Sequence, residues 1–225
     1  MDETLAALLR AQDQARQLFH RIDELGLICA GQTESTISEQ IYQLGERELG
    51  VTKHWHRRIV RAGPNTRLPF SVNPPDRVVM NEDVVSVDLG PVFGEYEADF
   101  GRTWVVGTDP KKRRLRDDLA TVFRDCRDFY RQRPSMSGAE LYGYVLASSE
   151  RSGWRFGGTH AGHLIGPFPL LPRQRDAAMN RIRPDNIYPM NDPDEEGRAR
   201  YWVLEIHLLD PTGRYGGFYE ELLTI

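Results

Sequence analysis

Two carboxylates lie at the edges of an apolar hairpin in residues 88–103, DLGPVFGEYEADFGRT. Asp88 follows the apolar run at 84–87, and Asp99 comes shortly before another apolar run at 104–106. Burying an ionised carboxylate is costly unless a positive group is close to it. The sequence therefore predicts a positive partner for these two acids elsewhere in the fold.

Later segments place more acidic or imidazole side chains where the pattern predicts burial. His163 lies in a Gly-His-Leu-Ile-Gly segment, Glu205 in an apolar strand and Glu220 in the last apolar strand. Divalent cations would remove the repulsion between such carboxylates. Carboxylate oxygens with one imidazole suit Mn, Fe, Co or Zn, and two such ions, about 3.5–4 Å apart, lower the pKa of a bound water. These residue types predict a hydrolytic centre with two divalent metal ions.

Each residue alone also has an ordinary structural explanation. Asp88 could cap the turn that follows it, Asp99 could pair with Arg102, and His163 could be a core or loop histidine. Glu205 could pair with an arginine, although an ionised glutamate inside an apolar strand is unusual. The five residues together, on separate segments, favour the metal centre.

The same segments resemble the metal-dependent aminopeptidase family that includes methionine aminopeptidase, aminopeptidase P and prolidase. The resemblance covers roughly residues 56–225 and rests on Asp-Leu-Gly, Tyr-Glu-Ala-Asp-Phe-Gly-Arg-Thr, Gly-His-Leu-Ile-Gly and two terminal strands that each carry a glutamate. It implies the α+β pita-bread fold, an antiparallel sheet with flanking helices. It also implies five metal ligands: Asp88, Asp99, His163, Glu205 and Glu220.

By this resemblance Asp88 binds one ion, and Asp99 and Glu220 bridge both ions. His163 and Glu205 complete the other site, and Glu205 is also the general base. The implied cofactors are two divalent ions, with Mn favoured over Co, Fe or Zn. The implied reaction removes N-terminal residues from short peptides, as an Xaa-Pro aminopeptidase or dipeptidase does. The alternatives are a creatinase-like C–N hydrolase and a peptide- or protein-binding module without efficient turnover.

The last ligand has two candidates, because Glu220 and Glu221 are neighbours. Alternate residues of a strand share a face, so Glu220 lies on the face of Phe218 and Glu221 on the face of Tyr219. The family pattern favours Glu220, and the sequence leaves Glu221 as the alternative.

Two histidines that the family usually carries near its substrate are missing. Phe70 stands where the first is expected, and residues 167–171, PFPLL, replace the second. His160 could replace one of them, and His54, His56 and His207 are other possibilities, of which His207 is best placed because it shares a strand face with Glu205. His160 and His207 form the predicted catalytic set with Glu205. The remaining candidates, His54 and His56, are expected at the surface or at the rim of a substrate pocket.

Helices and short strands must position these residues. Apolar spacing and capping residues predict helices over 5–27, from Ser35 or Thr36 to 49, 113–133 and 137–153. Strands are predicted over 78–80, 84–89, 96–99, 103–106, 202–209 and 217–225, with a loop around short strands over 156–183. Residues 1–225 are expected to form one domain that includes the helices of residues 1–50.

Composition narrows the class of protein. The chain has 225 residues and a net charge of −4, which gives no support for a nucleic-acid partner. It contains no apolar run of about 18 residues, so no membrane span is expected. Without a signal-peptide pattern, and with Cys29 and Cys126 far apart, a cytoplasmic location is expected. The aromatic residues Trp154 and Tyr215, if exposed, would allow a homodimer.

Overall fold

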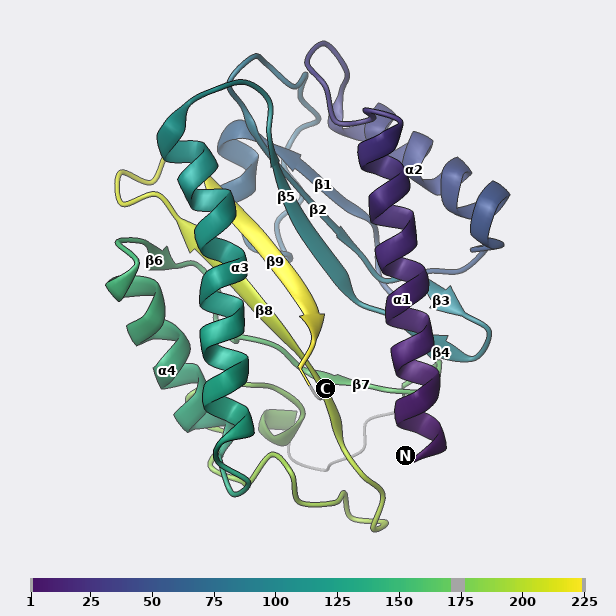
Figure 1. Cartoon of the computed structure of the whole chain (residues 1–225), viewed down its shortest axis with the longest axis vertical. Helices are drawn as coiled ribbons and strands as arrows, with labels where there is room; N and C mark the ends of the chain where they lie inside the picture. The colour runs from purple at the N-terminus through teal and green to yellow at the C-terminus, as the bar shows by residue number, and fades with distance from the viewer. Residues whose placement is uncertain (1, 171–176, 224–225) are drawn as a thin grey trace.

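One antiparallel sheet forms the centre of the computed structural model, which describes residues 2–170 and 177–223 (Figure 1). The helices are α1 (Glu3–Glu24), α2 (Glu34–Leu49), α3 (Pro110–Arg131) and α4 (Gly138–Arg151), with 3-10 turns η1 (Gly63–Arg67) and η2 (Ala177–Asn180). The strands are β1 (Ile59–Ala62), β2 (Val84–Leu89), β3 (Val92–Phe93), β4 (Tyr96–Glu97), β5 (Phe100–Val105), β6 (Arg155–Phe156), β7 (Leu164–Ile165), β8 (Tyr201–Leu209) and β9 (Gly216–Leu222).

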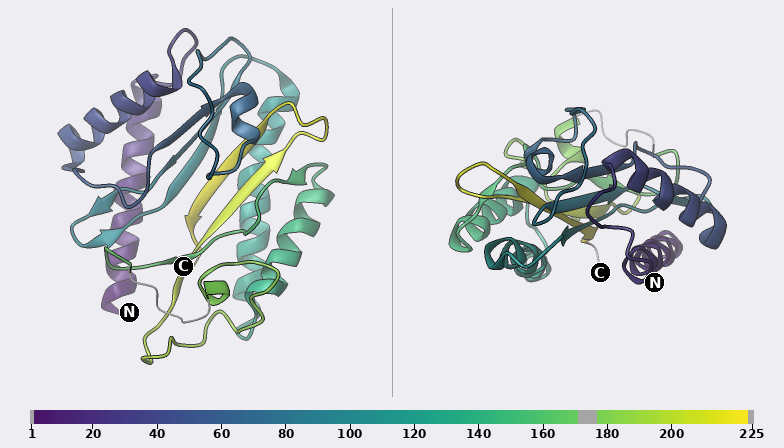
Figure 2. Two further views of the ribbon diagram at one scale, coloured as in Figure 1. Left: turned by 180° about the vertical axis from the view of Figure 1, so that it is seen from behind. Right: turned by 90° about the horizontal axis from the view of Figure 1, so that it is seen from above.

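The strand order in the sheet is β1-β2-β5-β9-β8-β6, with β7 paired to β8. Strands β3 and β4 form a separate small hairpin. Figure 2 shows α1, α3 and α4 on one face of the sheet, and its left panel shows the other face with η1 across it. The prediction of an α+β fold, with an antiparallel sheet and flanking helices, is confirmed.

Alternate side chains of β8 face opposite sides of the sheet, one side apolar and the other polar. Leu204, Ile206 and Leu208 are fully buried in the core cluster that includes apolar residues of α3. Burying each such side chain contributes about 1.5–3 kcal/mol. Glu205 and His207 point to the other face, because successive side chains of a strand alternate. The apolar half of the strand holds the sheet to the helices and leaves the polar half available for chemistry.

The helices lie where the sequence predicts them, with different ends. The N-cap of α2 is Thr33, whose side chain accepts a hydrogen bond from the Thr36 amide, so the expected caps Ser35 and Thr36 are wrong. The Ser35 side chain instead donates to Asp76, at 2.6 Å between Oγ and Oδ2. The capping box of Ser137 is present at the start of α4, as predicted.

Two strand predictions differ from the structure. Residues 78–80 are not a strand, because Val78 makes an isolated bridge to Thr33 at the start of α2 and does not join the sheet. Strand β1 was not predicted, since Arg61 interrupts its apolar pattern. Arg61 is nonetheless buried, and its guanidinium donates to three backbone carbonyls in residues 68–72.

The two halves of the sheet meet between β5 and β9. Gly101 lies opposite Glu220 in this pairing. Further along, the Thr103 hydroxyl donates to the Phe218 carbonyl at 2.8 Å and accepts from the Phe218 amide at 2.7 Å. A side chain therefore takes the place of a backbone rung at this junction.

Several surface expectations can be compared with burial. Trp154 is 2% exposed and Tyr215 is 7% exposed, because both pack in the core with α3. The suggestion that these two aromatic residues are exposed and form a dimer surface is therefore wrong.

Cys29 and Cys126 are both free thiols. Among the described residues, no helix has the length and apolar character needed to cross a bilayer. Of the last predicted strand, residues 224–225 lie outside the described residues.

Candidate active site

A cavity of about 710 Å³ opens on the sheet face opposite α1 and α3. Its walls come from β2, the segment before β5, the segment before β7, and strands β8 and β9. The structure brings all five predicted metal ligands together in this cavity: Asp88, Asp99, His163, Glu205 and Glu220.

Three of these acids lie in one row that crosses four strands. Asp88 of β2 is opposite Gly101 of β5, Gly101 is opposite Glu220 of β9, and Glu220 is opposite Glu205 of β8. A Cβ atom on Gly101 would lie 3.2 Å from the Glu220 Cβ and 2.5 Å from the ring of Phe218. The glycine therefore keeps open the space between the first acid of the row and the other two.

Asp99 and His163 approach this row from outside it. The His163 Nε2 atom lies 3.0 Å from Asp99 Oδ2 and 3.7 Å from Glu205 Oε1. Its Nδ1 donates to the Leu164 carbonyl at 2.8 Å. A histidine bonded in this way through one nitrogen presents the other nitrogen to a metal ion.

Burial dominates the electrostatics of the acids. It raises the pKa of Asp88 and of Glu205 to about 7, and raises the pKa of Glu220 well above its ordinary value. Burial would also raise the pKa of Asp99, but its hydrogen bond with His163 contributes to lowering this pKa to about 2. Four carboxyl groups thus share a space that disfavours their combined negative charge.

Arg61 and Arg181 line the same cavity, but in the described part of the chain neither forms an ion pair with these acids. Among the described residues, no lysine or arginine nitrogen lies within ion-pair distance of any of the four carboxylates. The Asp88 Oδ1 atom is buried and has no hydrogen-bond partner within residues 2–170 and 177–223. Buried oxygen donors and an imidazole that converge without a fixed cation fit divalent metal ions.

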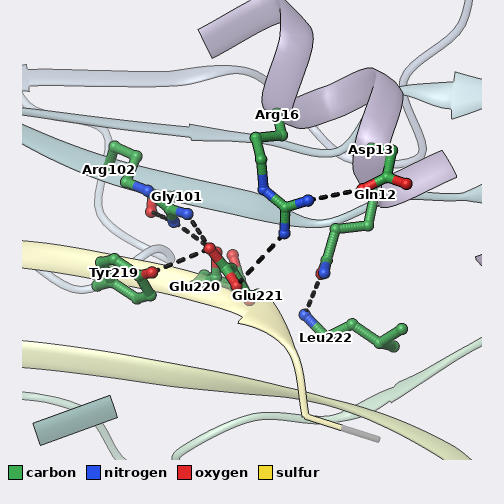
Figure 3. A network of polar contacts seen from close by, with 9 residues as sticks. All are labelled: Gln12, Asp13, Arg16, Gly101, Arg102, Tyr219, Glu220, Glu221 and Leu222. Carbon is green, nitrogen blue, oxygen red and sulfur yellow. Dashed lines mark hydrogen bonds and ion pairs between the residues drawn. The ribbon is translucent and has the colours of Figure 1, made fainter. Parts of the chain in front are cut away.

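Glu221 is not among the residues that line the cavity, and Figure 3 shows the polar contacts that it makes instead. Its carboxylate forms an ion pair with Arg102 and accepts a hydrogen bond from the Tyr219 hydroxyl at 2.9 Å. Arg16 lies 3.9 Å from its other oxygen. Arg102 is therefore the partner of Glu221 and not of Asp99, and Glu220 is the acid of this pair that faces the cavity.

The two predicted replacement histidines differ in what they contact. The His160 Nδ1 atom is buried, 3.5 Å from Glu205 Oε1, and has no hydrogen-bond partner in the part of the chain that the structure describes. Burial, together with the nearby charge of Arg181, lowers the pKa of His160 to about 4. His207 lines the cavity, but its Nε2 donates to the Thr66 carbonyl at 2.8 Å. His160 is therefore next to the predicted base, while His207 is bonded to η1.

His56 lies in the centre of the site, so its expected place at the surface or rim is wrong. Its side chain is 7% exposed, and Nε2 lies 3.5 Å from Asp88 Oδ1 and 3.3 Å from Asp99 Oδ1. His54, two residues earlier, lies outside the cavity lining and is in ring contact with Tyr42. The segment that carries both histidines has no regular periodicity, so no pattern in it distinguishes the buried histidine from the other one.

Apolar side chains occupy the places of the two missing family histidines. Phe70 lines the cavity with its ring centroid 5.7 Å from that of His56, and Leu170 also lines the cavity. Leu171, the last residue of the PFPLL segment, lies outside the described residues. The wall beside the acids is therefore largely apolar.

The sequence model of metallopeptidase family M24 matches residues 6–188. The chain belongs to metallopeptidase family M24. No curated protein matches the M24 chain. Solved structures do: a prolidase from Pyrococcus furiosus with 20% identity and a TM-score of 0.74, and an X-Pro aminopeptidase from Thermotoga maritima MSB8 with 20% identity and a TM-score of 0.77. The dipeptidase PepE from Mycobacterium ulcerans has 22% identity and a TM-score of 0.77.

These likenesses confirm the pita-bread fold. The alignments cover 99%, 100% and 99% of the M24 chain. They cover 60%, 62% and 55% of the three larger proteins, so the M24 chain spans less than two thirds of their length. At this identity the likeness establishes the fold, and the substrate has to be argued from the site itself.

Proposed function

We propose that this M24 protein is a peptidase that uses two divalent metal ions to remove N-terminal residues from short peptides, with Xaa-Pro peptides as its substrates. One observation carries the proposal. Four carboxylates and an imidazole from separate segments line one cavity without a lysine or arginine partner among the described residues.

The residues that would hold the ions follow from the row and its neighbours. Asp88 lies at one end of the row and Glu205 at the other, with Glu220 between them, while Asp99 and His163 approach the row from outside it. These five residues would hold the ions, and the family resemblance implies that Asp99 and Glu220 would be shared by both. Divalent ions bound there would supply Lewis acidity and an activated water. The donor set of carboxylates and imidazole is compatible with Mn, Co, Fe or Zn.

Glu205 transfers protons in the reaction, and His160, which lies close to it in space, assists. Glu205 takes the proton from the attacking water and delivers it to the amine that leaves. The neutral ring of His160, 3.5 Å from Glu205 Oε1, orients that carboxylate. His207 holds η1 and the cavity wall that follows it, which positions substrate rather than moving protons.

The apolar wall supports a proline-containing substrate. Leu68, Phe70, Phe156 and Leu170 line the cavity beside the acids. A cavity of about 710 Å³ is in the range that binds small ligands, and apolar side chains suit a pyrrolidine ring. Two of the similar structures are a prolidase and an X-Pro aminopeptidase, which agrees with this choice. A cytoplasmic location is part of the proposal, supported by two free cysteines.

A second candidate is a metal-binding module that holds peptides without efficient turnover. Phe70 and Leu170 favour it, because they stand where the family resemblance expects histidines. A creatinase-like C–N hydrolase shares the same metal centre and differs only in substrate.

The test is a cleavage assay on protein stripped with a chelator and reloaded separately with Mn²⁺, Co²⁺ and Zn²⁺. Ala-Pro and Ala-Pro-Ala are compared with Ala-Ala and with creatine, and products are separated chromatographically. Metal-dependent cleavage of the proline peptides, lost by a factor of about 10²–10⁴ in Glu205→Gln, is expected. Tight binding of two ions without any cleavage would instead establish the binding module, and cleavage of creatine alone would establish the C–N hydrolase.

A further inference from the structure

We propose that His56 is a sixth metal ligand, which gives its Nε2 to the ion on the Asp88 side of the centre. The inference rests on the proposed function, because it adds a residue to the same metal site. It assigns an imidazole to each of the two ion positions, His56 to one and His163 to the other.

The donor atoms are already spaced as ligands of one ion. His56 Nε2 lies 3.5 Å from Asp88 Oδ1 and 3.3 Å from Asp99 Oδ1, and these three residues form a group whose ligand atoms lie within 4.8 Å of one another. Two donors at about 2.1 Å from a shared tetrahedral ion are about 3.4 Å apart. The spacing of His56 Nε2 from each of the two carboxylate oxygens therefore matches that of ligands of one ion.

The ring of His56 is oriented in the same way as that of His163. His56 Nδ1 donates to the carbonyl of the next residue, Arg57, at 2.7 Å, and His163 Nδ1 donates to the carbonyl of Leu164 at 2.8 Å. Each ring then directs Nε2 at a different oxygen of Asp99. This second hydrogen bond fixes the tautomer that binds a metal, so Asp99 lies between two imidazoles prepared in the same way.

The position of His56 is built into the fold. The preceding residue, Trp55, donates from its backbone amide to the Gly90 carbonyl at 2.9 Å and from its indole nitrogen to the Ala98 carbonyl at 3.0 Å. A Cβ atom on Gly90 would lie 2.2 Å from His56 Cδ2 and 2.5 Å from its Nε2. The glycine two residues after Asp88 thus makes room for the imidazole.

A second imidazole changes which metals the centre prefers. Imidazole nitrogen suits zinc and iron, whereas a site made of carboxylates alone suits magnesium and manganese. With His56 as a ligand, both positions of the centre carry nitrogen. The preference for Zn²⁺ over Mn²⁺ should therefore depend on His56.

The experiment measures metal binding directly, on the full chain. Metal-free wild type, His56→Ala and His56→Gln are titrated with Zn²⁺ and with Mn²⁺ by calorimetry, and X-ray absorption of the zinc-loaded proteins counts imidazole ligands. His163→Ala is the positive control. His54→Ala is the matched control, since His54 lies two residues away and outside the cavity lining. Circular dichroism verifies folding.

We expect two zinc ions in wild type and a loss of at least about tenfold in affinity for one of them in both His56 variants. The loss for Mn²⁺ should be smaller, and the average imidazole count per zinc should fall by half, while His54→Ala behaves as wild type. Two ions bound with unchanged affinity and unchanged imidazole count in folded His56 variants would overturn the inference alone. A wild type that binds no ion would overturn the proposed function as well. Loss of one zinc site in a protein that cleaves no peptide would leave the inference standing and remove only the peptidase.

Discussion

Glu205 and Glu220 lie directly opposite each other on neighbouring strands, β8 and β9. Like charges at opposed positions of a sheet are destabilising, and both residues lie in strands that are otherwise largely apolar. A pair arranged only for stability would not have this composition. The pairing is explained if cations occupy the space in front of it, and the following predictions test that explanation.

Substituting the adjacent acids Glu220 and Glu221 one at a time distinguishes the role of the cavity face of β9 from that of its opposite face. Glu220→Gln should abolish binding of at least one ion and reduce peptide cleavage by more than 100-fold, because this carboxylate lies in the acid row. Glu221→Gln should retain both ions and lose about 1.5–3 kcal/mol of stability, since it removes a charged partner of Arg102. Elemental analysis and urea unfolding measure the two effects. Equal metal loss in both variants would contradict the assignment.

Stability of the metal-free protein should fall as the pH rises from 6 to 9. Burial lowers the pKa values of His56 and His163, but their carboxylate neighbours outweigh this and raise both to about 9. A histidine whose pKa is raised by folding stabilises fully below its unfolded pKa, about 6.5, and that contribution is lost as the pH passes through 9. The buried Asp88 and Glu205, raised to about 7, change stability in the same direction between their ordinary pKa values and pH 7.

Thermal unfolding in the presence of a chelator measures this slope. The melting temperature should drop by at least about 2–4 °C, the equivalent of 1 kcal/mol for a chain of this size. Bound metal ions take the place of the protons, so the melting temperature of the metal-loaded protein should depend less on pH. In the metal-free state, the melting temperature of His163→Ala should also depend less on pH than that of wild type. A metal-free wild type that becomes more stable above pH 7 would contradict this electrostatic description.

A methyl group at Gly101 should damage the site from within the sheet. Its Cβ would lie 2.5 Å from the Phe218 ring and 3.2 Å from Glu220, so Gly101→Ala should cost about 1–3 kcal/mol and weaken metal binding. Gly143→Ala is the matched control, because nothing lies within 4 Å of the added atom on α4. It should stabilise the protein by about 0.5–1 kcal/mol and leave metal affinity unchanged. Calorimetry measures the stability and the metal affinity of both variants. Unchanged metal affinity in Gly101→Ala would contradict the prediction.

His207→Ala distinguishes a positioning role from a catalytic one. The substitution removes the hydrogen bond from His207 to the Thr66 carbonyl, which holds η1 beside the cavity. We expect a loss of about 1–3 kcal/mol in stability and a rise in KM larger than the fall in kcat, since substrate positioning is affected. A large fall in kcat with unchanged KM would show that His207 acts on the reacting atoms.

Local patterns in the sequence were sufficient for most of the secondary structure and for the five candidate ligands. The capping box at Ser137 and the apolar runs around Asp88 and Glu205 are signals that act over a few residues, and each appears in the fold near its predicted place. Strand alternation placed Glu220 and Glu221 on opposite faces, and the family pattern favoured Glu220, which is the one that lines the cavity.

Features that depend on distant pairing could not be predicted in this way. The row of acids requires the register of β5 against β9, which joins residues about half a chain apart. His56 reaches the centre only because Gly90 leaves space for it, and no periodicity marks that contact. Strand β1 was missed because Arg61 interrupts its apolar pattern. The buried guanidinium of Arg61 donates hydrogen bonds to three backbone carbonyls.

The junction between β5 and β9, where the Thr103 hydroxyl substitutes for a backbone rung, separates the contributions of the two ends of the chain. Asp88 and Asp99 precede this junction and His163, Glu205 and Glu220 follow it in sequence. Ions bound among them would connect residues from both sides of the β5–β9 junction. We therefore expect metal loading to slow hydrogen exchange on both sides of this junction together.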